Sequence, residues 1–335
     1  MKFSPIFTNH AVLAAHAPIR IWGEGEGIAT VILAGQSLEA AAKDGRWQVE
    51  FPPMEYGGPY ELTLTSQDGS ITLSDIYVGE VYLFSGQSNM QFKLKESNTP
   101  TEEYESLDLL RYFSAERPEA GDRFTPANGW VVSRADEVGD WSSIAYIASR
   151  AIAKKKGVAV GAICCAQGAS VIESWVPRGT FEAHGTGVSP EFRFVDHTHE
   201  RYGRWNSDGY LYETMLSQVI PYSITGVAWY QGESDVSVEE GAVYADELRT
   251  LIEVWRSDFC SPELPFVIIQ LADHISKRPR PGWLLVQDAQ TEVGRTVPNA
   301  ETVICRDLCE PEMIHPVSKF VLSERVADAF VRLVK

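Results

Sequence analysis

The residue best placed for chemistry in this sequence is Ser88, which follows a run of apolar residues at positions 81–84. That run predicts a buried strand, and the small polar residues after it end the strand abruptly. A serine at the end of a buried strand can present its hydroxyl to a cleft, as a nucleophilic serine must. The alternative is an ordinary strand-to-helix turn in which Ser88 or Asn89 caps the next helix.

Three further polar clusters follow apolar runs elsewhere, at 166–170, 231–235 and 310–316. The first two come directly after predicted strands, and the third lies between the last predicted strand and the last predicted helix. In open parallel sheets, sites form beyond the carboxyl ends of the strands, so all three should converge on Ser88. Together they supply a serine, His315, carboxylates and small residues whose amides can approach an oxyanion. These are the components of acyl transfer.

The elements that must position these clusters come from residues 77–335, where apolar strands alternate with helical stretches. We expect strands at 81–85, 158–165, 224–230, 265–271 and 302–305, and helices near 141–155, 237–256, 282–294 and 317–334. The helix at 237–256 is the best marked, because Ser237 and Glu240 match a capping box. This order predicts an α/β domain with a parallel sheet covered by helices on both faces. The stretches 97–130 and 176–210 read as irregular insertions that shape a cleft.

Residues 1–76 have a different pattern, with short alternating segments separated by turn signals. The segments are 19–22, 30–33, 47–51, 60–64 and 71–73. Such spacing predicts a small antiparallel β-sandwich. A chain of 335 residues is long for one compact domain, and we therefore expect two, a β-sandwich-like domain at 1–76 and the α/β domain at 77–335.

Composition and charge exclude several classes of protein. The net charge of −17 disfavours nucleic acid and anionic membranes as partners. No apolar run approaches the roughly 20 residues that cross a bilayer, and the first residues lack the apolar core of a signal peptide. Five cysteines, two of them adjacent, do not indicate a disulfide framework. We therefore expect a protein of the cytoplasm, with export after removal of a signal peptide as the alternative.

Two other clusters of polar residues are candidate sites. His197 and His199 lie beside Asp196 and Glu200, and such a set offers nitrogen and oxygen ligands to a metal. A solvated loop is the commoner explanation of such residues, so we expect no metal and no cofactor. The pair at 273–274, an aspartate and a histidine, follows a predicted strand and is a second candidate for lining the cleft.

Three motifs give the sequence a family resemblance. They are GQSNM at 86–90, WYQGESD at 229–235 and IHP at 314–316, and the likeness extends to AVLAAHAPIRIWG, GPYELTL and IESWVP. On these segments the chain resembles the sialate O-acetylesterase family, a branch of the SGNH hydrolases, over nearly its whole length. The resemblance implies an SGNH-type three-layer α/β/α domain with a central parallel sheet, preceded by a small β-sandwich. It also implies an esterase that removes O-acetyl groups from sugars.

The resemblance assigns roles to single residues. Ser88 would be the nucleophile, and His315 the base that takes its proton. The superfamily pattern places an aspartate three residues before the histidine, where this chain has Glu312. Glutamate can orient an imidazole as aspartate does. Glu310 and Asp307 are the alternatives for the acid.

An oxyanion hole is also implied, formed by the amides of Ser88 and Gly168 and by the side chain of Gln231. Relatives carry a glycine pair where this chain has Gly168 and Ala169, and Tyr-Asn where it has Tyr212 and Glu213. Gln231 has an alternative role as a structural amide that ties loops together, with Glu233 and Asp235 fixing its loop. The residues expected to contact substrate are Gln87, Asn89 and Glu233.

We therefore expect a serine esterase that acts on an acetylated carbohydrate through an acetyl-enzyme. One alternative is an SGNH esterase for an acetylated polysaccharide such as xylan. Another is a carbohydrate-binding protein with a decayed triad, which the substitution at Glu312 keeps open. A third is a metal hydrolase that uses His197 and His199. The sequence indicates neither the sugar nor the oligomeric state.

Overall fold

The structure is a computed structural model that describes residues 1–117, 129–195, 202–275 and 278–334. Its centre is a sheet with the strand order β10-β9-β11-β8-β12-β13-β14. These strands are β8 (Gly69–Gly86), β9 (Leu107–Ser114), β10 (Val131–Ser133), β11 (Val160–Ala166), β12 (Gly226–Tyr230), β13 (Phe266–Ile269) and β14 (Ala300–Val303). Neighbouring strands run parallel from β9 to β14, whereas β10 is antiparallel to β9. The sheet is therefore mixed, with an antiparallel edge.

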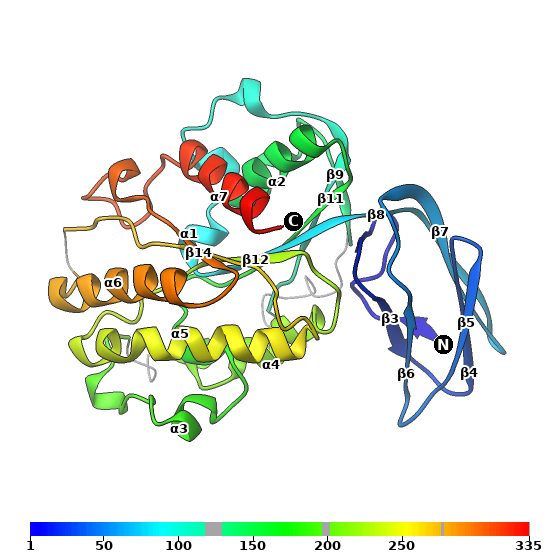
Figure 1. The fold of residues 1–335 in the computed structure, drawn as a ribbon, viewed down its shortest axis with the longest axis horizontal. Helices are drawn as coiled ribbons and strands as arrows, with labels where there is room; N and C mark the ends of the chain where they lie inside the picture. Colours follow the sequence, from blue (N-terminus) through cyan, green and yellow to red (C-terminus); the bar gives the residue numbers. More distant parts are fainter. Residues whose placement is uncertain (118–128, 196–201, 276–277, 335) are drawn as a thin grey trace.

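Four long helices cover the two faces of this sheet (Figure 1). The pair α2 (Ser143–Lys156) and α7 (Phe320–Leu333) packs together on one face, and α5 (Val238–Asp258) packs with α6 (Arg280–Thr296) on the other. Helix α5 begins with the predicted capping box, in which the Glu240 amide donates to Ser237 Oγ and the Ser237 amide donates to Glu240 Oε2, both at 3.0 Å. The expected α/β architecture is confirmed.

The strands that lead to the candidate site are buried on both faces. Every residue of β11 and β12 is buried, and so is every residue of β8 from Tyr82 to Gly86. Burial on both faces explains why the sequence there is continuously apolar rather than alternating. Gly86 ends β8 with a φ of 133°, and a Cβ there would lie 2.1 Å from the carbonyl oxygen of Tyr230. Only glycine fits this last position before the serine motif.

The expectation that 97–130 is irregular is wrong for Leu107–Ser114, which form β9 next to β11. The strand contains Arg111, whose charge interrupts the apolar run, yet its side chain is only 2 % exposed. Its guanidinium is compensated by Asp75, 3.0 Å away. A partner so distant in the sequence gives no local signal, and the strand was therefore missed. The stretch 176–210 contains short helical turns such as α3 (Thr180–His184) among its described residues.

The first part of the chain forms small sheets beside this α/β region (Figure 1). One sheet consists of β1 (Lys2–Phe3), β3 (Ile19–Glu24) and β6 (Arg46–Phe51). Strands β4 (Ile28–Leu33), β5 (Gln36–Ala41) and β7 (Gly57–Ser66) pair in turn and join β8, which β2 (Val12–Ala14) also flanks. Strand β8 crosses the expected domain boundary at 76–77 without a break. The sandwich arrangement and the division into two domains stay predictions.

An aromatic cluster joins the first residues to the α/β region. The ring of Phe7 lies 4.7 Å from Trp22 and 5.5 Å from Tyr222, and Tyr222 in turn lies 6.3 Å from Trp130. The Trp130 indole N–H donates to the carbonyl of Ile6 at 2.8 Å. Buried rings carry much of the apolar area of a core, so this contact joins the two parts firmly.

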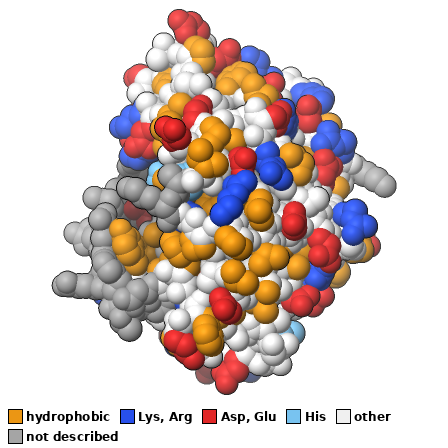
Figure 2. All heavy atoms as spheres, turned by 90° about the vertical axis from the view of Figure 1, so that its left-hand side faces the viewer, with side chains coloured by type: hydrophobic (Ala, Val, Ile, Leu, Met, Phe, Trp, Pro, Cys, Tyr) orange, Lys and Arg blue, Asp and Glu red, His pale blue; other side chains and the backbone are white. Residues whose placement is uncertain are grey.

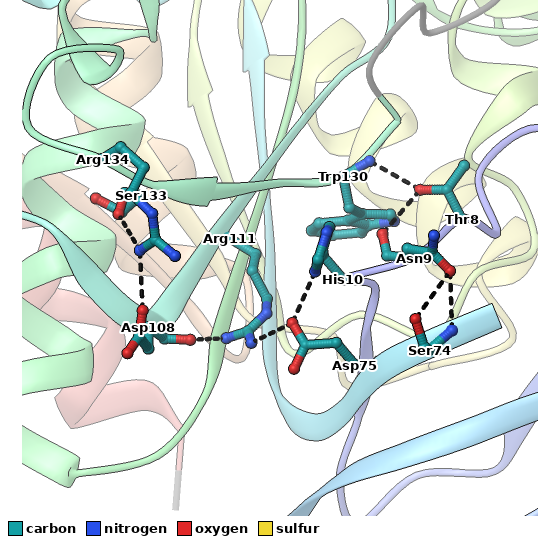
Figure 3. A network of polar contacts seen from close by, with 10 residues as sticks. All are labelled: Thr8, Asn9, His10, Ser74, Asp75, Asp108, Arg111, Trp130, Ser133 and Arg134. Atoms are coloured by element: carbon teal, nitrogen blue, oxygen red, sulfur yellow. Dashed lines mark hydrogen bonds and ion pairs between the residues drawn. The ribbon is translucent and has the colours of Figure 1, made fainter.

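Polar contacts complete the junction (Figure 3). His10 Nδ1 lies 2.7 Å from Asp75 Oδ2, and the same oxygen accepts from Arg111 Nη2 at 3.0 Å. Arg111 also donates to the backbone carbonyl of Asp108. The side chain of Asp108 accepts from Arg134 Nη1 at 2.9 Å. The carboxylate of Asp75 therefore bridges a residue of the first segment and a buried arginine of the sheet.

Candidate active site

Ser88 is the first residue of a short helix, α1 (Ser88–Gln91), directly after β8. The residue that caps this helix is Gln87, and no side chain makes a capping hydrogen bond there. The interpretation of Ser88 or Asn89 as a helix cap is therefore wrong. The Ser88 hydroxyl oxygen instead lies 2.8 Å from Nε2 of His315. The structure thus brings together the two residues on which acyl transfer would depend.

His315 comes from the loop between β14 and α7, 227 residues after the serine. Burial lowers the pKa of this imidazole below its usual 6.5, and the positive charges of Lys319 and Arg278 lower it further, whereas Glu96 opposes them. A lowered pKa keeps the ring neutral near neutral pH. Only a neutral imidazole can accept the proton of Ser88.

Among the described contacts, none of the candidate acids forms a hydrogen bond or ion pair with the His315 ring. Glu312 is exposed and makes no hydrogen bond or ion pair with any residue that the structure describes. Asp307 is held by the guanidinium of Arg325 through contacts of 2.8 and 2.7 Å. One carboxylate oxygen of Glu310 accepts a hydrogen bond, and the other is buried without a partner in the described part of the chain. The identity of the acid stays a prediction.

Gly168 lies on the loop after β11 and faces the serine. A Cβ built on this glycine would lie 3.5 Å from Cβ of Ser88. The Gly168 N–H donates to the side-chain carbonyl oxygen Oε1 of Gln91 at 3.0 Å. The Gly168 N–H, which was expected to donate to the ester oxygen of the substrate, is therefore already bonded to Gln91. Sequence reasoning missed Gln91, although its spacing of three residues from Ser88 places both on one side of a helical turn.

Gln231 is fully buried and each end of its amide is engaged. Its Nε2 donates to the Ser170 carbonyl at 2.8 Å and to a carboxylate oxygen of Asp235. Its Oε1 accepts from the Tyr244 hydroxyl at 2.8 Å. The other Asp235 oxygen accepts from the Ile172 amide at 3.1 Å, so these contacts tie the loop after β12 to the loop after β11. They favour the structural alternative for Gln231, and its oxyanion role stays a prediction.

Asn89 and Glu233, expected to contact substrate, are buried, and each is 1 % exposed. Asn89 Nδ2 donates to Glu233 Oε1 at 2.6 Å and to the Ile314 carbonyl at 2.9 Å. Asn89 Oδ1 accepts from Lys319 Nζ at 2.6 Å. Gln87 is also buried, and its Oε1 accepts from the Gly232 amide at 3.3 Å. The contacts of these residues are with protein groups, and their substrate contacts stay predictions.

Lys319 is the functional candidate that sequence reasoning missed. Its side chain is fully buried, although it stands immediately before α7. The available signal was a lysine four residues after His315, just ahead of an apolar helical stretch. Lysine is almost never fully buried unless it is paired. The pairing, however, is with Asn89, 230 residues away.

The remaining sequence candidates lie at other contacts. The Tyr212 hydroxyl donates to Asp258 at 2.8 Å, and Glu213 pairs with Arg178 on the surface. Within the described residues, no group of three His, Cys, Asp or Glu side chains is arranged to hold a metal ion. The stretch 196–200, with both histidines of the metal alternative, lies outside the described residues. None of the described helices combines the length and apolar character that a membrane crossing requires.

Figure 2 views the molecule from the side at which α6 begins, the left-hand side of Figure 1. Lys and Arg side chains are interspersed there with Asp and Glu side chains, around patches of hydrophobic residues. The net charge of −17 is therefore not gathered into one acidic surface on this face.

Comparisons with known proteins agree with the fold. The profile of the family described as "carbohydrate esterase, sialic acid-specific acetylesterase" matches residues 78–332. The chain is 26 % identical over 369 residues to the sialate O-acetylesterase of Homo sapiens, which covers 97 % of this chain and 69 % of the human protein. It is 25 % identical over 391 residues to the Mus musculus sialate O-acetylesterase, with 97 % and 72 % covered.

Among solved structures, a carbohydrate acetylesterase of Xanthomonas citri shares the fold with a TM-score of 0.84 at 23 % identity, over 99 % of this chain and 75 % of that one. Fold and matches define the protein as a carboxylic ester hydrolase of the α/β carbohydrate-esterase class. Within that class, the chain belongs to the sialic acid-specific acetylesterase family. The resemblance seen in the sequence motifs is thereby confirmed.

Proposed function

We propose that the protein removes O-acetyl groups from sugars by acyl transfer through Ser88 and His315. The observation that carries this mechanism is the 2.8 Å contact between Ser88 Oγ and His315 Nε2. Membership of the acetylesterase family supports an acetyl ester as the bond that is broken. The relatives named sialate O-acetylesterase support an O-acetylated sialic acid as the sugar.

The reaction has two halves. His315 takes the proton of Ser88, whose oxygen attacks the acetyl carbonyl carbon. The bond from that carbon to the sugar oxygen breaks, and His315 returns the proton to the sugar hydroxyl, leaving an acetyl group on Ser88. Water, deprotonated by the same imidazole, then attacks this acetyl-enzyme. Acetate leaves, and the serine recovers its proton.

The negative charge that develops on the carbonyl oxygen needs donors placed in advance. The amides of Ser88 and Gly168 are the proposed donors, because Gly168 faces the serine. The Gln91 carbonyl, which holds the Gly168 N–H at 3.0 Å, must turn away when substrate enters. Gln231 acts in this proposal by fixing the loop after β11, since its own amide protons are engaged.

Glu312 is the proposed acid that orients His315. Its support is its position three residues before the histidine and its lack of other partners within the described residues. Contact with the imidazole requires the loop between β14 and α7 to turn the carboxylate inward. Glu310 is the alternative acid, because one of its oxygens is buried without a partner among the described residues.

We further propose that residues 1–76 form a β-sandwich-like domain and residues 77–335 an SGNH-type three-layer catalytic domain. The change from short sheets to a helix-covered sheet supports this division, although β8 belongs to both parts. The proposed place of action is the cytoplasm, which the five free cysteines support. The proposed partner is an acetylated carbohydrate, with no nucleic acid or membrane surface involved.

The test is hydrolysis of a chromogenic acetyl ester and of an O-acetylated sialic acid by wild type and by Ser88→Ala. We expect the variant to lose activity by about 10⁵-fold or more, because the nucleophile is gone. Ser217→Ala, which removes an exposed hydroxyl bonded only to the Glu213 carbonyl among the described contacts, is the matched control. Retained activity in Ser88→Ala would assign the nucleophile elsewhere. Loss of wild-type activity with a chelator would favour the metal alternative.

A further inference from the structure

We propose that Lys319 is a positioning residue, which acts through Asn89 to hold the loop carrying His315 within hydrogen-bond reach of Ser88. The inference rests on the function proposed above and concerns the same site. Lys319 bonds to Asn89 rather than to the reacting atoms, so its role is to place another residue.

Asn89 is the link between the two halves of the site. It follows Ser88 on α1, and its side chain makes three hydrogen bonds, two with the segment between β14 and α7 and one with the loop after β12. One goes to the carbonyl of Ile314, the residue before His315. The second goes to Glu233 after β12, and the third comes from Lys319 before α7. Because one planar amide satisfies all three, its orientation is fixed, and the backbone next to His315 is fixed with it.

The surroundings of Lys319 keep its ammonium group in place. The side chain is 0 % exposed, and Nζ lies 5.2 Å from the ring centre of Phe92 and 5.5 Å from that of Tyr230. Such rings attract a cation through their faces. On the other side of Asn89 stands the buried carboxylate of Glu233. A buried charge without compensation is costly, so the two charges favour an arrangement with Asn89 held between them.

The charge state of Lys319 is consistent with this role. Burial lowers its pKa to about 8, against the opposing effects of Cys305, Glu233 and Glu310. Burial likewise raises the pKa of Glu233, against the hydrogen bond from Asn89. At neutral pH the lysine therefore remains mostly protonated and can donate to Asn89.

Lys319 also acts on His315 through space. After burial, its positive charge is the largest cause that lowers the pKa of His315, and the other charged or titratable groups facing the ring are Arg278, Glu96 and His274. Removal of the lysine charge should allow the imidazole to protonate at higher pH. Since only neutral imidazole accepts the serine proton, the acidic limb of kcat/KM should then move to higher pH.

The experiment compares Lys319→Met, Lys319→Arg and the wild type. Both substitutions should lower the plateau of kcat/KM by about 10- to 100-fold, mainly in kcat, because the loop is displaced. The acidic limb should move to higher pH in Lys319→Met and stay near the wild-type position in Lys319→Arg, which keeps the charge. The matched control is Lys156→Met. It removes a different lysine, whose Nζ lies 2.5 Å from the buried carboxylate of Glu80. It should leave both kinetic constants unchanged.

A second readout does not depend on hydrolysis. The titration of the His315 imidazole is followed by NMR, with its signal assigned by its absence in His315→Asn, and folding is checked by thermal unfolding. A folded Lys319→Met protein with wild-type plateau and wild-type imidazole titration would overturn the inference. If Lys319→Met does not fold, an unchanged plateau in Lys319→Arg would overturn it. If wild type hydrolyses no acetyl ester, the proposed function fails, and the NMR titration alone then decides the role of Lys319.

Discussion

Two histidines of this protein are held in opposite ways. His10, at the junction of the first sheets with the α/β region, lies 2.7 Å from the carboxylate of Asp75 (Figure 3). His315, at the carboxyl ends of the sheet strands, lies 2.8 Å from the hydroxyl of Ser88. The first has an acid but no serine among its described hydrogen bonds. The second has a serine, while the predicted acid, Glu312, stays in solvent.

A close contact between a histidine and a carboxylate therefore does not by itself indicate a catalytic site. The Asp75 carboxylate also pairs with Arg111, so His10 belongs to a structural ion network. His315 instead contacts the hydroxyl of Ser88, the proposed nucleophile, at the start of α1, and Gly168 faces that serine.

The largest effect is expected from His315→Asn. Because asparagine cannot accept the Ser88 proton, kcat/KM should fall by about a thousandfold or more. Initial rates with a chromogenic acetyl ester measure this loss, and thermal unfolding verifies that the variant is folded. Activity within a few-fold of wild type would mean that another group serves as the base.

A smaller loss is expected from Glu312→Gln. The carboxylate is not seated against His315 in the free protein, so we expect kcat to fall by about a hundredfold, less than in triads whose acid is already in place. Glu310→Gln tests the alternative acid, and its activity should change by about threefold or less if Glu312 is the acid. If the larger loss falls on Glu310→Gln, that residue is the acid. If neither variant loses activity, Ser88 and His315 work as a pair.

Gln91→Ala should change activity in the opposite direction. Removal of the carbonyl that occupies the Gly168 N–H frees this donor for substrate, so KM should fall by about three- to tenfold while kcat is unchanged. Gln36→Ala, at an exposed glutamine of β5, is the control and should match wild type. A lower kcat in Gln91→Ala would show that the side chain positions the loop rather than blocking the donor.

The smallest effect on rate is expected from His10→Asn, whose kcat and KM should equal those of wild type. Its free energy of unfolding should fall by about 1 kcal/mol, through the lost contact with Asp75. Asp75→Asn should cost more, because the buried guanidinium of Arg111 loses its carboxylate. Denaturant unfolding measures both. A loss of activity without a loss of stability would mean that the junction communicates with the site.

The same contact gives stability a pH dependence. Burial acts to raise the pKa of Asp75, but hydrogen bonds from His10 and Arg111 outweigh it, and the pKa lies below its usual 3.8. A carboxyl with a lowered pKa stabilises the folded state above 3.8 and loses this contribution as the pH falls through the lowered value. Asp75→Asn should therefore differ from wild type at neutral pH, and the difference should shrink in acid.

Local periodicity made much of the fold and site predictable. The apolar runs before 86, 166 and 230 are strands because they are buried on both faces, and their parallel order brings Ser88 and Gly168 together. Strand β9 escaped because Arg111 interrupts its run. The burial of Lys319 was not predictable, because it depends on a partner 230 residues away in the sequence. The acid was not predictable, since the loop from β14 to α7 has no long helix or strand to fix where a carboxylate points.

Strand β8 runs without interruption through 18 residues and belongs to both parts of the molecule. At roughly 3.3 Å per residue it spans much of the molecule, with the hairpin to β7 at one end and Ser88 just beyond the other. A chain shortened to begin at residue 77 would contain only the second half of β8. It would also lack Phe7, and the aromatic cluster of Tyr222 and Trp130 would become exposed. We expect such a fragment to aggregate on expression, so the first sheets would be needed to keep the α/β region folded and in solution.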